Sequence, residues 1–76
     1  MKHKNIYRIA PFGVHWAIEN DDIGLSMYFS KGNALSAANE MIKEKPGAVI
    51  QVYDHNGNFE KSIHSDQNIN SADSYR

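Results

Sequence analysis

The feature that most constrains this chain is its single stretch with a helical period, residues 30–46, S-K-G-N-A-L-S-A-A-N-E-M-I-K-E-K-P. Its apolar residues recur at spacings of three and four, which places them along one side of a helix. These residues are Ala34, Leu35, Ala37, Ala38, Met41 and Ile42. A helix with one narrow apolar side, flanked by short alternating runs, is typical of a helix that covers one face of a sheet.

Signals at both ends of this stretch support a helix. Ser30 can cap the N-terminus, because its hydroxyl can accept a backbone N–H of the first turn at a position where serine is strongly preferred. Pro46 and Gly47 prevent the helix from continuing at the other end. The three alanines on the apolar side predict a close approach between the helix and a sheet.

Three short runs before the helix predict three strands joined as an antiparallel meander. They cover residues 6–10, 14–19 and 25–29, and turn residues separate them. Pro11 is expected to end the first strand, because proline has no N–H to donate to a neighbouring strand.

Alternation along these strands assigns side chains to the two faces of the sheet. The second strand has on one side Val14, Trp16 and Ile18. The third strand has on one side Leu25, Met27 and Phe29. We expect the face that contains Trp16 to be buried. We expect the opposite face to be left uncovered and to carry Arg8, His15, Ala17, Tyr28 and Gln51.

A second hairpin is predicted after the helix, with strands at residues 48–53 and 59–65 around Asp54-His55-Asn56-Gly57. Two registers are compatible with this turn. A two-residue turn at Asn56-Gly57 brings Phe59 onto the face of Ile50 and Val52, whereas a type I turn with a glycine bulge sets Tyr53 opposite Phe59. Asp54 favours the bulge, because aspartate is preferred at the first position of a type I turn.

The order β-β-β-α-β-β predicts an α+β fold class, with two layers and one helix packed on one face of an antiparallel sheet. A chain of 76 residues has room for one domain, which we assign to residues 6–65. Residues 1–5 form a basic N-terminal arm. Residues 66–76 are polar and without periodicity, so we expect a flexible tail.

Several local motifs recur together in one known family. They are Tyr7-Arg8-Ile9-Ala10-Pro11, Trp16-Ala17-Ile18, Phe29 with Asn33-Ala34-Ala37-Ala38, and the run from Val52 to Asn56-Gly57. Over residues 6–62 this pattern resembles a family of short bacterial proteins known as domain of unknown function two-one-eight-eight. This chain departs from the family in having Val14-His15 before Trp16 and in the greater distance of Asp73-Ser74-Tyr75 from the last strand. The resemblance implies the fold and a bacterial or phage origin, and it assigns no catalytic residue.

Composition excludes several classes of protein. The chain has no cysteine, so it has no disulfide framework and no thiolate chemistry, and a reducing cytoplasm is the expected location. The apolar residues near the N-terminus are interrupted by Arg8, Pro11 and His15, so we expect no signal peptide and no membrane-spanning run. A net charge of -1 provides no overall field that would attract nucleic acid or anionic lipid.

No group of residues predicts catalysis or a cofactor. The four histidines, His3, His15, His55 and His64, are scattered, whereas a zinc site needs three or four converging ligands. The acidic residues Glu19, Asp21 and Asp22 are typical of a solvated turn, because acid–base catalysis requires carboxylates inside a cleft. We therefore expect a protein that is not an enzyme and that carries neither a metal nor a cofactor.

Two functional hypotheses remain. The first is protein–protein binding through the uncovered sheet face or an unpaired edge, to another protein or to a second copy of this chain, with Arg8, His15, Ala17, Tyr28 and Gln51 as contact residues. The alternative is binding of single-stranded RNA or DNA by the basic and aromatic residues Lys2, Lys4, Tyr7, Arg8 and Tyr28. Strand alternation separates Arg8 from Tyr7, and this weakens the alternative.

Overall fold

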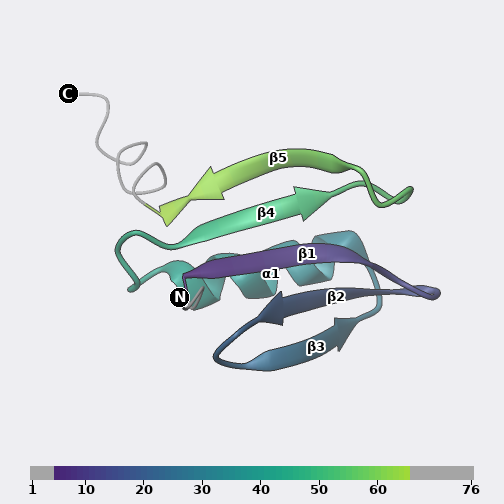
Figure 1. Ribbon diagram of the computed structural model, residues 1–76. Coiled ribbons are helices and arrows are strands. Elements are labelled where there is room, and N and C mark those ends of the chain that lie inside the picture. Colours follow the sequence, from purple (N-terminus) through teal and green to yellow (C-terminus); the bar gives the residue numbers. More distant parts are fainter. Residues whose placement is uncertain (1–4, 66–76) are drawn as a thin grey trace.

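One helix lies across one face of a five-stranded sheet, and the rest of the described chain leaves the other face without a helix (Figure 1). This computed structural model describes residues 5–65. In chain order its elements are β1 (Ile6–Phe12), β2 (His15–Asn20), β3 (Gly24–Tyr28), α1 (Lys31–Ile42), β4 (Val49–Tyr53) and β5 (Phe59–His64). The predicted α+β class and element order are confirmed. The predicted tail and nearly all of the predicted basic arm lie outside the described residues.

The sheet is mixed, with the strand order β3-β2-β1-β4-β5. We expected a wholly antiparallel sheet, but β1 and β4 run parallel, with Tyr7 opposite Ile50 and Ile9 opposite Val52. The physical reason lies in the connection, because the chain crosses the sheet through α1 and then adds β4 beside β1. Parallel neighbours need such a crossover, whereas the other three pairings are antiparallel.

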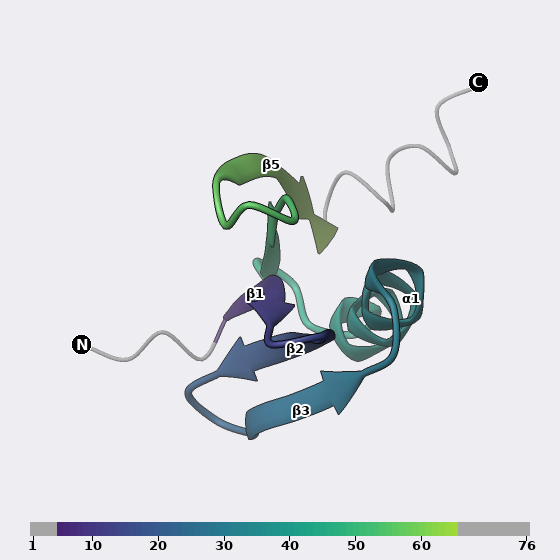
Figure 2. The same cartoon turned by 90° about the vertical axis from the view of Figure 1, so that its right-hand side faces the viewer.

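The core lies between α1 and the face of the sheet that α1 covers (Figure 2). The helix contributes Ala34, Ala38 and Ile42, which have no exposed surface. The sheet contributes Tyr7, Ile9, Ile18, Ile50 and Val52. The predicted apolar side of the helix and its close approach through alanine are confirmed, since two fully buried alanines face the strands.

The prediction of which β3 side chains lie on the buried face of the sheet was wrong. Tyr28 lies opposite Trp16 on the face covered by α1, while Leu25 and Met27 point to the other face and are exposed. Residues directly opposite each other in an antiparallel pair share a face, so the position of Trp16 determines that of Tyr28. Val14, which we expected to be buried, lies exposed in the turn before β2.

Asn20 explains this register. Its side-chain oxygen accepts hydrogen bonds from the backbone N–H groups of Asp22 and Ile23, at 2.8 and 3.1 Å, and its amide nitrogen donates to the carbonyl of Ile6 at 2.9 Å. This buried asparagine fixes the turn so that Asn20 pairs with Gly24. The turn therefore sets which side of β3 faces the helix, although the larger apolar residues lie on the other side.

Two boundaries differ from the sequence prediction. Strand β1 continues through Pro11, which pairs with Trp16 of β2. Pairing with β4 stops at Ile9, so Pro11 has a neighbouring strand on one side only, where a missing N–H is tolerated. The helix ends at Ile42 instead of continuing to Pro46. Beyond Ile42 the backbone N–H groups of Lys43 and Lys45 donate to the carbonyls three residues earlier, of Glu40 and Ile42, which tightens the last turn, and the residue before Pro46 disfavours the helical conformation.

The β4–β5 hairpin has the bulged register that Asp54 favoured. Tyr53 lies opposite Phe59, and a bulge follows Val52. The Asp54 carboxylate accepts hydrogen bonds from the backbone N–H groups of Asn56 and Asn58, each at 2.9 Å. Gly57 has a φ of 86°, a left-handed conformation that favours glycine.

The predicted cap of α1 is confirmed and can be tested by mutation. The Ser30 hydroxyl accepts a hydrogen bond from the backbone N–H of Asn33 at 3.1 Å. We expect Ser30→Ala to lower the free energy of unfolding by about 1 kcal/mol, and Ser30→Asp to retain most of it because aspartate also caps well. Urea denaturation measures both variants. Equal losses in the two variants would contradict a capping role.

The turn of the second hairpin predicts a pH dependence. The hydrogen bond from Asn58 lowers the pKa of Asp54, and the one from Asn56 adds to this effect. A lowered folded-state pKa stabilises the fold above the unfolded-state pKa of about 3.9, and this contribution disappears as the pH falls through the folded-state value. We therefore expect the stability difference between the wild type and Asp54→Asn to shrink in acid, as measured by urea denaturation at about pH 6 and about pH 2.5. An unchanged difference would show that the charge of Asp54 has no role.

Candidate binding surface

The face of the sheet opposite α1 is the candidate binding surface, and we call it the open face. Strand register places on it, from β3 to β5, the side chains of Leu25, Met27, His15, Ala17, Glu19, Arg8, Ala10, Phe12, Gln51, Tyr53, Phe59 and Ser62. The face contains both apolar side chains and a row of polar ones that crosses the strands. Protein interfaces combine an apolar centre with polar groups around it, so this face is a candidate for binding another protein.

The polar row runs across four strands. Arg8 on β1 lies opposite Glu19 on β2 and opposite Gln51 on β4, and Gln51 lies opposite Ser62 on β5. The Arg8 guanidinium donates a hydrogen bond to the Glu19 carboxylate at 2.9 Å. This bond raises the pKa of Arg8, partial burial opposes the rise, and the nearby Tyr53 side chain adds to it. Arg8 is therefore held in the row by its ion pair with Glu19 on the neighbouring strand β2.

A hollow of about 280 Å³ lies beside this row. Ala10 and Ala17 face each other across β1 and β2 and form its floor, because neither has a side chain long enough to fill the space. Ala17 is only 5% exposed although it points away from the helix. Phe12 and Leu25 form apolar walls, and the ion pair of Arg8 and Glu19 completes the rim.

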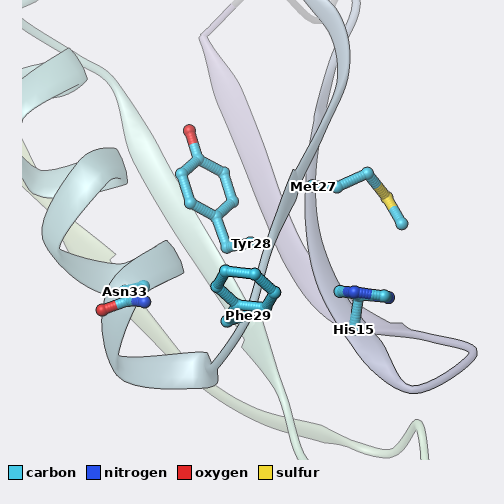
Figure 3. A pocket seen from close by; sticks show the side chains of 5 residues that line it. All are labelled: His15, Met27, Tyr28, Phe29 and Asn33. Atoms are coloured by element: carbon cyan, nitrogen blue, oxygen red, sulfur yellow. The ribbon is translucent and has the colours of Figure 1, made fainter.

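A second hollow, of about 320 Å³, lies where β3 ends and α1 begins (Figure 3). Figure 3 shows Tyr28 on the side of the helix and Met27 with His15 on the other side of β3. The rings of His15 and Phe29 stack at 5.8 Å between centroids with a tilt of 34°. Asn33 in the first turn of the helix completes the lining. This hollow wraps around the end of an edge strand.

Four of the five predicted contact residues share the open face. Arg8, His15, Ala17 and Gln51 lie there, while Tyr28 packs against the core on the other side. Ala17 lies at the bottom of a hollow, so a partner would reach it only with an inserted side chain.

The residues of the nucleic-acid hypothesis are not brought together. Tyr7 is 2% exposed and belongs to the core, and Tyr28 faces the helix. Arg8 lies on the open face in its ion pair with Glu19. Lys2 and Lys4 lie outside the described residues. Within residues 5–65, therefore, no aromatic of this set lies beside its arginine.

The sequence prediction missed the apolar part of the open face. Phe12, Leu25 and Met27 are exposed there, and Phe59 packs edge-on against Tyr53 with 5.7 Å between ring centroids. For Leu25 and Met27, the signal in the sequence is the turn that begins with Asn20, because the register it sets points both side chains away from the helix.

No group of three or more histidine, cysteine, aspartate or glutamate side chains in residues 5–65 is placed to hold a metal ion. The helix within this part of the chain is not long and apolar enough to cross a membrane.

Mutation of Arg8 and Glu19 measures how much their ion pair contributes to the stability of the fold. The side chains of Arg8 and Glu19 are both more than one-third exposed, and such surface pairs contribute about 0.2–1 kcal/mol. We expect Arg8→Met and Glu19→Gln each to lower the free energy of unfolding by less than about 1 kcal/mol, with a coupling in a double-mutant cycle that weakens in high salt. A coupling far above this range would mean that the pair is part of the core.

Comparisons of this chain with family models, with curated proteins and with solved structures found no match. The resemblance to domain of unknown function two-one-eight-eight stays a prediction.

Proposed function

We propose that this protein acts by binding another protein on its open face and that it is not an enzyme. The observation that supports this proposal is the hollow above Ala10 and Ala17, which lies in an apolar surface and is bordered by the ion pair of Arg8 and Glu19. Protein interfaces concentrate binding energy in this way, with an apolar side chain in a central pocket and polar groups around it.

The size of the hollow favours a side chain over a small molecule. Sites for drug-sized ligands occupy about 300–1,000 Å³ and enclose most of the ligand, whereas this hollow has about 280 Å³ and is floored by two alanines on a sheet surface. A leucine or phenylalanine from a partner fits this description. Its neighbours in the partner would face Arg8, Glu19 and Gln51, which offer both hydrogen-bond donors and acceptors.

The cell compartment and origin are part of the same proposal. The absence of cysteine suits a reducing cytoplasm, and the resemblance described above suggests a bacterial or phage protein. A small interaction or regulatory protein of this kind needs no catalytic group. Nucleic-acid binding is less favoured, because the aromatic residues of that hypothesis lie in the core or against the helix.

Filling the hollow tests the proposal. We expect Ala17→Met to weaken binding of the natural partner by about tenfold or more, because the new side chain occupies the space of the partner's anchor. Ser36→Met, on the exposed side of α1, is the matched control and should bind as the wild type does. The measurement is capture of the partner from the native host, followed by titration of the purified partner against each variant.

Two results would contradict this proposal. One is a partner that binds the wild type and Ala17→Met equally well, when circular dichroism shows that Ala17→Met is folded. The other is binding of single-stranded DNA or RNA that falls steeply between two salt concentrations, because phosphate contacts release counterions. That second result would establish the nucleic-acid alternative.

A further inference from the structure

The two edges of the described sheet differ in how well they are protected. Strand β5 has the charged residues Glu60 and Lys61, and a bulge interrupts its pairing with β4. Charges and bulges at an edge discourage another strand from pairing there. Strand β3 has the sequence G-L-S-M-Y, with no charge, no proline and a regular register. Figure 1 shows no other strand of the described chain on its outer side.

An apolar stripe follows this unprotected edge. Ile23, Leu25, Met27 and Phe29 occupy alternate positions and are 46%, 51%, 46% and 82% exposed, respectively. Leu25 and Met27 lie on the open face, and Phe29 contacts His15 of the same face. Leu25 and Met27 share a side because alternate residues of a strand do, while Ile23 and Phe29 lie just before and just after β3. Four exposed large apolar side chains in seven residues indicate a surface that another chain covers.

We propose that a second copy of this chain pairs with β3, so that the two β3 strands run antiparallel across a two-fold axis. Pairing over all five residues of Gly24–Tyr28 fixes the register, because the middle residue must lie on the axis. That residue is Ser26, which then faces Ser26 of the second copy. The two open faces lie on the same side of the joined sheet.

The sequence of β3 is complementary to itself in this register. Leu25 lies opposite Met27 of the second copy, so apolar side chains meet on the open face. Tyr28 lies opposite Gly24 of the second copy, whose lack of a side chain avoids a clash with the Tyr28 ring that packs against its own core. Beyond the strand, Ile23 lies near Phe29 of the second copy. Each pairing occurs twice because of the two-fold axis.

This pairing goes beyond the proposed function and does not depend on it. Dimerisation uses the outer edge of β3, whereas the docking of another protein uses the hollow floored by Ala10 and Ala17, and the two surfaces share Leu25, which forms a wall of the hollow. Either proposal can fail while the other holds.

Disulfide trapping tests the register directly, because the chain has no cysteine of its own. Directly opposed residues of an antiparallel pair have Cα atoms about 4.5–5.5 Å apart, within the range of about 4.4–6.8 Å that a disulfide spans. We expect Ser26→Cys to form a cross-linked dimer under mild oxidation at least about tenfold faster than Ser62→Cys. Ser62 is the matched control, because it is an exposed serine on the opposite edge strand.

Sedimentation gives the second measurement. We expect the wild type to reach twice its mass of 8.6 kDa as its concentration rises. A lysine on an edge strand opposes pairing, so Met27→Lys should raise the dissociation constant by about tenfold or more, and Val14→Lys in the exposed β1–β2 turn should leave it unchanged. Circular dichroism confirms that each variant is folded.

Three outcomes would overturn the pairing. The first is a wild type that stays monomeric at millimolar concentration. The second is a dimer that Met27→Lys leaves intact, which would place the contact elsewhere. The third is trapping of Ser26→Cys no faster than Ser62→Cys. If β3 binds an extended segment of a different protein instead, the wild type is monomeric alone and the inference is wrong.

Discussion

The structure depends on the packing of one short helix against one face of the sheet. Ala34, Ala38 and Ile42 bring α1 close to Ile9, Ile18 and Ile50, and these residues have no exposed surface. Burial of apolar surface is the main source of stability in a small domain. Residues 5–65 contain a single long helix, which can cover only one of the two faces, so this part of the chain leaves the second face of the sheet to solvent. The candidate binding surface is a direct result of this shortage of covering elements.

The hollow in the open face results from differences in side-chain size between neighbouring positions of the sheet. A pleated surface with similar side chains at every position is nearly flat, but two facing alanines lower it locally, and Phe12 and Leu25 raise its borders. The ion pair of Arg8 and Glu19 then sets a polar limit to the apolar area. Since the helix packs on the other side, these residues lie outside the cluster between α1 and the sheet, and all of them except the buried Ala17 are at least partly exposed. They can change in sequence without loss of the fold, as surface residues generally can.

Local patterns in the sequence predict the features that depend on neighbouring residues. The cap at Ser30, the apolar side of α1 and the bulged turn at Asp54 all involve contacts within a few positions, and all three are confirmed. The parallel pairing of β1 with β4 joins distant segments and was not predicted. The face of β3 was wrong for a related reason, because Asn20 reaches across to Ile6 and fixes a register that hydrophobicity alone does not reveal. Alternation in β1, β2 and β4 is local, so it placed four of the five predicted residues on the open face correctly, whereas the hollow depends on the register between strands.

The parallel pairing at the centre of the sheet has a consequence for how the chain folds. The middle of the sheet is built from β1, near the start of the domain, and β4, which follows the helix. On a ribosome the first three strands and the helix emerge before β4. One edge of β1 therefore has no neighbouring strand until synthesis passes residue 52. Contacts between such distant segments slow folding, because a long loop must close before they form. We therefore expect the described strands and helix to fold as one cooperative unit, because an isolated two-stranded hairpin is at best marginally stable in water.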